Sequence, residues 1–291
     1  MKFRENELKI SQTCIGSFRE CRQSRGLGFE VKLLLPAALA GMCAWSGVAE
    51  AQVEVGVPQQ IQEDVELGTN PARMTRSIEI RNEYLSFGDG VGNNTLRLSY
   101  TQPFGPAADW SLKVTLPYSS FFGIEGDPSA LGDVSFKVTH VLSIGAEQGW
   151  AASAEYFADT ADPGLGFGQN ALKLQIVNVQ FLDSGALFAP TLLQTIGLGN
   201  EEDDADLNIS TVDFYYVPKL ADPRTLLTFD PNVTYDWTNE NAYAGLSITA
   251  GRMIGQAFGG NMIAYVKPSV FAGGDRPSDW GLEVGFKLIG F

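Results

Sequence analysis

The sequence predicts an all-β protein: a transmembrane, antiparallel, up-and-down β-barrel of about 12 strands, preceded by a signal peptide. Two observations carry this prediction. Beyond the N-terminal region there is no apolar run of about 20 residues, the length that a helical span needs. Short segments that alternate apolar and polar residues instead recur along the chain, each bounded by Gly, Pro, Asn or Asp. A barrel needs only every second residue to be apolar.

The signal peptide is expected at residues 31–51. Lys32 is followed by an apolar run up to Trp45, and Ala49-Glu50-Ala51 forms a small-x-small site with cleavage after Ala51. A signal anchor is the alternative, which the short run disfavours. A lipoprotein signal at Cys43 would want a small residue where Met42 stands.

Residues 1–30 are polar, mix Arg with Glu, and do not resemble the start of a signal peptide. We interpret them as an extension that arises from a misplaced start codon. Cys14, Cys21 and Cys43 all precede the cleavage site, so the mature chain has neither a disulfide framework nor thiolate chemistry. A net charge of −14 argues against nucleic acid as a partner.

Residues 52–75 are mixed and weakly patterned, and they form either a periplasmic lead-in or a plug folded into the lumen. Residues 76–291 are expected to form one closed outer-membrane barrel. Its predicted strands are residues 76–87, 95–104, 110–118, 132–142, 150–158, 171–181, 186–196, 207–217, 225–235, 242–251, 261–270 and 280–291. An even number suits a bacterial barrel with both termini in the periplasm.

The early segments alternate clearly. In the first, Ile78 and Ile80 alternate with Glu79 and Arg81. The next three have these apolar sets: Leu96, Leu98 and Tyr100; Trp110, Leu112, Val114 and Leu116; Val134, Phe136 and Val138. In residues 150–158, Tyr156 falls on one parity and Glu155 on the other. One face of each strand is therefore apolar and the other polar.

Two middle segments are less regular. Between Ile176 and Val179 the apolar parity slips, which suggests a β-bulge. Residues 186–196 are ambiguous because Leu187 and Phe188 compete for the apolar face. The periplasmic turns are expected at 105–109, 143–149, 182–185, 218–224 and 252–260, and the outer loops at 88–94, 119–131, 159–169, 197–206, 236–241 and 272–279.

The last segment alternates strictly. Its apolar parity comprises Trp280, Leu282, Val284, Phe286 and Leu288. Outer-membrane barrels commonly end on an aromatic residue, as this chain does. However, Phe291 shares the parity of Glu283 and Lys287, so either it lies one register off or the strand slips at Ile289-Gly290.

The polar parity is expected to face the lumen. Its charged residues are the acids Glu79, Glu83, Asp133, Glu155, Asp213, Asp230 and Glu283 and the bases Arg81, Arg97, Lys113, Lys137, Lys173, Lys267 and Lys287. Seven acids and seven bases leave the lumen about neutral. These charges either pair across the interior and brace the barrel or line a path for solute.

We predict no catalytic residue, metal site or cofactor. His140 faces outward near the periplasmic rim, and Ser143, the nearest serine, points to the other face. The acidic loop at residues 200–206 lacks the spacing of a calcium-binding loop. The Gly-rich stretch at residues 164–168 opens no helix, so it indicates a flexible outer loop rather than a phosphate site.

Three short motifs go beyond a generic barrel: Leu131-Gly132-Asp133-Val134-Ser135-Phe136-Lys137, Leu227-Thr228-Phe229-Asp230-Pro231 followed by Tyr235-Asp236-Trp237, and Ser278-Asp279-Trp280. With them the chain resembles the outer-membrane proteins grouped as the meta-pathway phenol-degradation family. The resemblance implies a barrel for passage of small, often aromatic or hydrophobic, compounds, and it supplies no catalytic or ligand-binding residues.

Together these patterns favour a channel or uptake protein in the outer membrane of a Gram-negative bacterium, through which small solutes pass passively. A non-conducting structural or binding barrel with a plugged lumen is the first alternative, and a lipid-modifying barrel enzyme is the second. The expected partners are outer-membrane lipid and lipopolysaccharide, the barrel-assembly machinery and a small-molecule solute.

Overall fold

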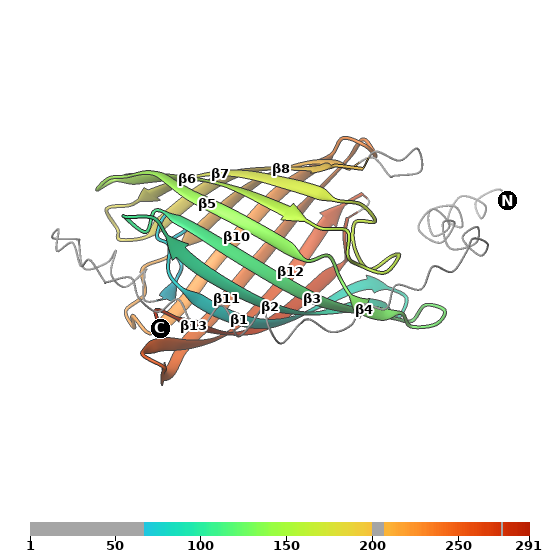
Figure 1. Ribbon diagram of the computed structural model, residues 1–291, viewed down its shortest axis with the longest axis horizontal. Helices are drawn as coiled ribbons and strands as arrows, with labels where there is room; N and C mark the ends of the chain where they lie inside the picture. Colours follow the sequence, from blue (N-terminus) through green and yellow to red (C-terminus); the bar gives the residue numbers. More distant parts are fainter. Residues whose placement is uncertain (1–66, 200–206, 275) are drawn as a thin grey trace. The chain divides into compact units, whose positions relative to one another are not determined.

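The strands close into a single antiparallel barrel (Figure 1). The computed structural model describes residues 67–199, 207–274 and 276–291. Its strands are β1 (Ser77–Gly88), β2 (Val91–Phe104), β3 (Trp110–Phe122), β4 (Ser129–Leu131), β5 (Ser135–Ile144), β6 (Gln148–Phe157), β7 (Ala171–Phe181), β8 (Leu187–Gly197), β9 (Asn208–Val217), β10 (Thr225–Asp236), β11 (Asn241–Ala257), β12 (Gly260–Gly273) and β13 (Trp280–Ile289). Among the described residues no helix is long and apolar enough to cross a membrane.

The prediction of 12 barrel strands is confirmed. Apart from β4, each strand pairs with the next strand along the chain, with β3 pairing with β5, and β1 pairs with β13 to close the ring. The short strand β4 is additional: it pairs only with β3, through Tyr118, Ser119 and Ser120. We call the end of the barrel that carries Ser77 and Ile289 the terminus end, and the opposite end the loop end.

Two connections are tighter than the sequence suggested. The expected loop 88–94 is a turn at Asp89-Gly90, and the expected turn 252–260 shrinks to Phe258-Gly259. All four of these residues have positive φ, between 51° and 83°. Such a pair matches the right-handed twist of a hairpin, so the flanking strands extend almost to the tip.

The outward side chains form an apolar belt, whereas many inward side chains are small and polar. Ile80, Leu98 and Phe286 are 46%, 42% and 52% exposed. Inside, the hydroxyls of Thr95 and Ser119 lie 3.0 Å apart, and those of Ser99 and Thr115 lie 3.1 Å apart. This alternation is the pattern expected of a barrel whose outside meets lipid.

The expected bulge in β7 is wrong, because the register of β7 with β6 and β8 is continuous. Val177 and Val179 keep the inward parity of Lys173 and Gln175. The same holds in β8, where Leu187 is 2% exposed and points inward. The inner wall is simply apolar there. The bulges lie instead between Ser86 and Gly88, Val141 and Ser143, and Met253 and Gly255.

At the end of β13 the predicted slip is present. Ile289 keeps the inward parity and is 2% exposed. Gly290 has a φ of 73°, which breaks the alternation, so Phe291 leaves the strand. The Phe291 carbonyl accepts a hydrogen bond from Arg76 Nη1 at 3.1 Å. Leu288 stays in outward parity with Phe286.

Candidate functional site

An ionic cluster occupies the lumen wall where the barrel closes. Arg81 on β1 lies between Glu79, with its Nη1 3.6 Å from Oε2, and Glu283 of β13, with its Nε 3.6 Å from Oε2. Lys113 Nζ on β3 is 3.7 Å from Glu79 Oε2. The Tyr265 hydroxyl donates to both glutamates, at 2.9 and 3.0 Å. Four strands are therefore joined through one set of charges.

Sequence reasoning missed Tyr265, although it shares the parity of Lys267. The β12–β13 register sets Tyr265 opposite Gly285, and a Cβ on that glycine would collide with the phenol ring. The missing side chain lets the ring lie across the strand and reach both glutamates. Gly285 is thus a packing requirement of the cluster.

Other predicted lumen charges form smaller groups. Arg97 pairs with Glu83 at 2.6 Å, and Lys267 pairs with Asp230 at 3.2 Å. Asp213 lies beside Asp230 on the neighbouring strand. Ser135 donates to Glu155 at 2.7 Å, and the Lys173 ammonium lies 5.1 Å from the centre of the Phe157 ring. Lys113, Lys137, Glu155 and Lys173 lie directly opposite one another on β3, β5, β6 and β7, so these charges form a row around the wall.

Asp133 serves a loop at the loop end of the barrel. It precedes β5, is 8% exposed, and accepts hydrogen bonds from the backbone amides of Thr160, Ala161 and Phe167, at 3.3, 3.2 and 2.6 Å. The Phe167 ring also packs edge-on against Phe157, 5.2 Å away. The Asp133 carboxylate is therefore one of the contacts that tie the Gly-rich loop to the barrel.

Replacing Asp133 by alanine should loosen that loop. Three amides lose a charged acceptor, and hydrogen bonds to charged groups contribute about 1.5–3 kcal/mol. Hydrogen exchange should therefore accelerate at Thr160, Ala161 and Phe167, while the amides of β7 stay protected. Asp133→Asn, which keeps one carbonyl acceptor, should give an intermediate effect. Unchanged exchange in the alanine variant would mean that the loop is held by other contacts.

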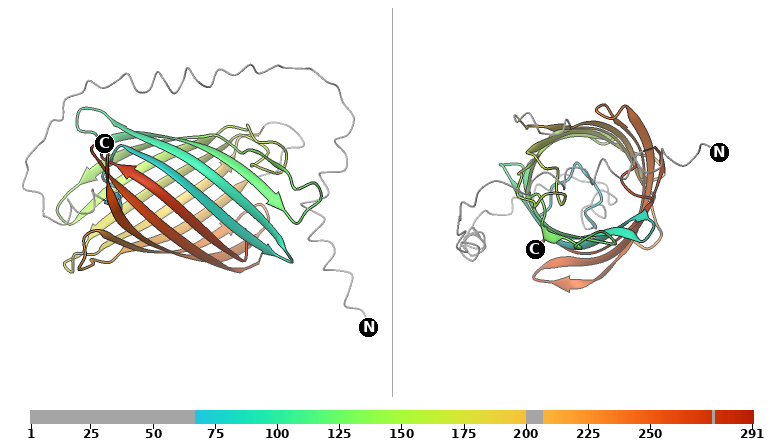
Figure 2. Two further views of the ribbon diagram at one scale, coloured as in Figure 1. Left: turned by 90° about the horizontal axis from the view of Figure 1, so that it is seen from below. Right: turned by 90° about the vertical axis from the view of Figure 1, so that its right-hand side faces the viewer.

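The chain before β1 lies inside the barrel at its terminus end. Viewed along the barrel in Figure 2, the cyan segment that precedes β1 lies within the ring of strands. Ala72 is 2% exposed and packs in an apolar cluster with Ala151, Val177, Val179, Leu187, Ala189 and Val217. The Met74 sulfur accepts a hydrogen bond from Ser111 at 3.2 Å. We call residues 67–75 the inner segment. Because Ala72 of this segment packs against β7 and β8, the inward side chains of these two strands are apolar there.

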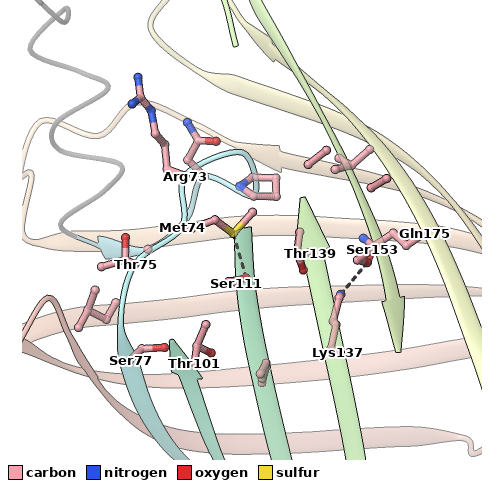
Figure 3. A pocket seen from close by; sticks show the side chains of 18 of the residues that line it. Arg73, Met74, Thr75, Ser77, Thr101, Ser111, Lys137, Thr139, Ser153 and Gln175 are labelled. Atoms are coloured by element: carbon pink, nitrogen blue, oxygen red, sulfur yellow. Dashed lines mark hydrogen bonds between the residues drawn. The ribbon is translucent and has the colours of Figure 1, made fainter. Parts of the chain in front are cut away.

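A cavity of about 230 Å³ lies between the inner segment and the wall (Figure 3). Asn70, Arg73 and Met74 line it from the segment, and Lys113, Lys137 and Lys287 are among the residues that line it from the strands. Lys137 Nζ donates to Gln175 Oε1 at 2.7 Å. Burial lowers the pKa of the Arg73 guanidinium from its ordinary value. Polar side chains and several apolar ones share this space.

His140 lies outside the lumen, as predicted. Its ring stacks on Trp110 with the ring centres 3.9 Å apart, and its Nε2 is 3.5 Å from Asp109 Oδ2. Within the described ranges no cluster of three or more His, Cys, Asp and Glu is placed to hold a metal ion. The acidic loop at residues 200–206 lies outside the described residues.

No family model matches the chain, and no curated protein matches it. Solved structures do. The COG4313 outer membrane channel from Pseudomonas putida F1 is 13% identical over 74% of this chain and 95% of its own, with a TM-score of 0.59. The KdgM porin in complex with disordered oligogalacturonate is 9% identical over 73% of this chain and 98% of its own, with a TM-score of 0.51. A NanC porin is 8% identical over 74% and 98%, with a TM-score of 0.50. At these identities the likeness establishes the fold.

Proposed function

We propose that this chain forms a channel in the outer membrane of a Gram-negative bacterium, through which small solutes pass passively. The observation that carries the proposal is the combination of an apolar outer belt with a polar lumen that contains a cavity of about 230 Å³. The solved barrels of the same fold are named as channels and porins, which supports a transport role without catalysis.

The finer assignments belong to the same proposal. Residues 31–51 act as the signal peptide, and the barrel-assembly machinery inserts the mature chain among outer-membrane lipid and lipopolysaccharide. The motifs at residues 131–137 and 227–237 support a relationship to the meta-pathway phenol-degradation family. The fold is consistent with that relationship, and the solute would then be a small aromatic or hydrophobic compound.

Planar-bilayer recording tests the channel directly. Purified full-length protein should produce discrete single-channel steps, because the polar lumen contains open space beside the inner segment. Protein heated until it unfolds serves as the control and should give none. If neither the wild type nor a variant without the inner segment conducts, the channel hypothesis is wrong.

A non-conducting binding barrel is the second candidate. The inner segment favours it, because Ala72 is anchored in an apolar cluster and Met74 is bonded to the wall. The two candidates differ in one measurable property. A binding barrel would retain a solute and pass no current, whereas a channel would pass current.

A further inference from the structure

The charged side chains that line the cavity beside the inner segment are all positive. Lys113, Lys137 and Lys287 line it from β3, β5 and β13, and Arg73 lines it from the inner segment. None of its lining residues, all of them within the described part of the chain, is an aspartate or a glutamate. Two acids lie beside this lining: Glu79 is 3.7 Å from Lys113, and Glu155 is opposite Lys137 in the β5–β6 register. The cavity surface is therefore cationic although the whole lumen is about neutral.

Two buried donors at this cavity lack acceptors. Asn70 Nδ2 and Arg73 Nε are inaccessible to solvent and have no hydrogen-bond partner among the described residues. Lys137 has a neutral partner, Gln175. Buried donors are almost always paired in proteins, because an unpaired one loses its hydration without compensation. The ammonium groups that line the cavity fit a ligand that brings acceptor oxygens and negative charge.

The rest of the lining is apolar or small. Pro71 and Met74 of the inner segment face Ala151, Val177 and Ile289 of the wall. The volume of about 230 Å³ lies below the roughly 300–1,000 Å³ typical of sites for drug-sized ligands. The space therefore suits a compact body about the size of a single ring, with its charged end towards the lysines.

We propose that this cavity binds small organic carboxylates with a compact apolar body, and that it makes them the preferred solutes. The inference rests on the proposed channel function and names its solute class. The carboxylate would accept hydrogen bonds from the lysine ammonium groups of the lining, while its apolar part lies against Met74 and Val177. Because the site remains open to water, binding is weak enough for the solute to leave, as conduction requires.

Binding is tested with full-length protein in detergent micelles and with sodium benzoate as the probe, by isothermal titration calorimetry. Benzyl alcohol, which keeps the ring and lacks the charge, should bind at least about tenfold more weakly, because a charged hydrogen bond is lost. Lys137→Gln and Lys287→Gln should each weaken benzoate binding by about tenfold. Lys219→Gln, at an exposed lysine of the β9–β10 turn, should bind like the wild type.

Several results would overturn the site. Equal binding of benzoate and benzyl alcohol would remove the role of charge, and equal binding of inorganic phosphate would reduce the cavity to a general anion site. Unchanged benzoate affinity in both lysine variants would place binding elsewhere. The gel-mobility shift of folded barrels on heating checks that each variant is folded.

Reversal potentials in a salt gradient separate this inference from the channel function. The wild type should prefer anions, and the two lysine variants should lose part of that preference. If the protein conducts but prefers cations and does not bind benzoate, the proposed solute class is wrong and the channel function is still supported. Benzoate binding without any conduction would refute the channel and leave the binding site standing.

Discussion

Replacing Leu98 by arginine should lower the free energy of unfolding in lipid vesicles by about 2–4 kcal/mol, the cost of an arginine at the bilayer midplane on a barrel surface. Leu98 lies in the middle of β2, is 42% exposed, and pairs with Ile80 and Leu116. All three point outward, so no polar group of the barrel can receive the guanidinium. Urea unfolding followed by tryptophan fluorescence measures the loss.

The matched control is Val233→Arg. Val233 is also outward and is 53% exposed, but it lies close to the loop end of β10. An arginine there reaches the interface and should cost no more than about 1 kcal/mol. Equal losses at the two positions would contradict a membrane belt centred on Leu98. No loss at either would show that the apolar face does not meet lipid at all.

Deleting the inner segment, residues 67–75, should raise the single-channel conductance severalfold. The segment occupies the terminus end of the lumen, and its removal merges the cavity of about 230 Å³ with the space that the segment fills. The barrel should still close, because β1 starts at Ser77 and its pairing with β13 does not use these residues. Unchanged conductance would mean that the constriction lies elsewhere.

A disulfide provides the complementary variant. A Cβ on Gly149 would lie 3.3 Å from the Ala72 Cβ, and a short adjustment brings that separation into the roughly 3.5–4.5 Å range of disulfides. Ala72→Cys with Gly149→Cys should therefore cross-link the segment to β6 on oxidation. All native cysteines precede residue 52, so protein produced from Gln52 onward contains no competing thiol. The oxidised variant should conduct no better than the wild type, and absence of the cross-link would contradict the placement of the segment.

Local alternation was enough to predict the strands, because neighbouring residues such as Ile78 and Glu79 show by their polarity which side chain points outward and which points inward. It misjudged β7 and β8, where Val179 and Leu187 are apolar and yet point inward. The reason is long-range: Ala72 packs on them, and nothing near Val179 in sequence reveals that contact. The change of apolar parity that predicted a β-bulge is thus produced by this packing contact.

The lumen charges could be predicted, but their grouping could not. Parity places Glu79, Arg81 and Glu283 on the inner face, but which of them meet depends on the register between β1 and β13. The parity of Asp133 likewise did not reveal that its carboxylate accepts hydrogen bonds from loop amides, because those amides are 27 or more residues away in the sequence. Tyr265 could have been found from its spacing to Lys267, had uncharged side chains been considered as members of an ionic cluster.

The pairing of β1 with β13 has a consequence for assembly. The contacts between Ser77 and Ile289 join the two ends of the barrel sequence, so the ring closes only after nearly the whole chain is available. All other strand pairs join neighbours and can form early, whereas this one carries the largest loop-closure entropy. Folding should therefore be limited by a late zipping of the first and last strands. Until that step the edges of β1 and β13 expose unpaired amides and carbonyls, which makes the nearly complete sheet the species most prone to aggregate.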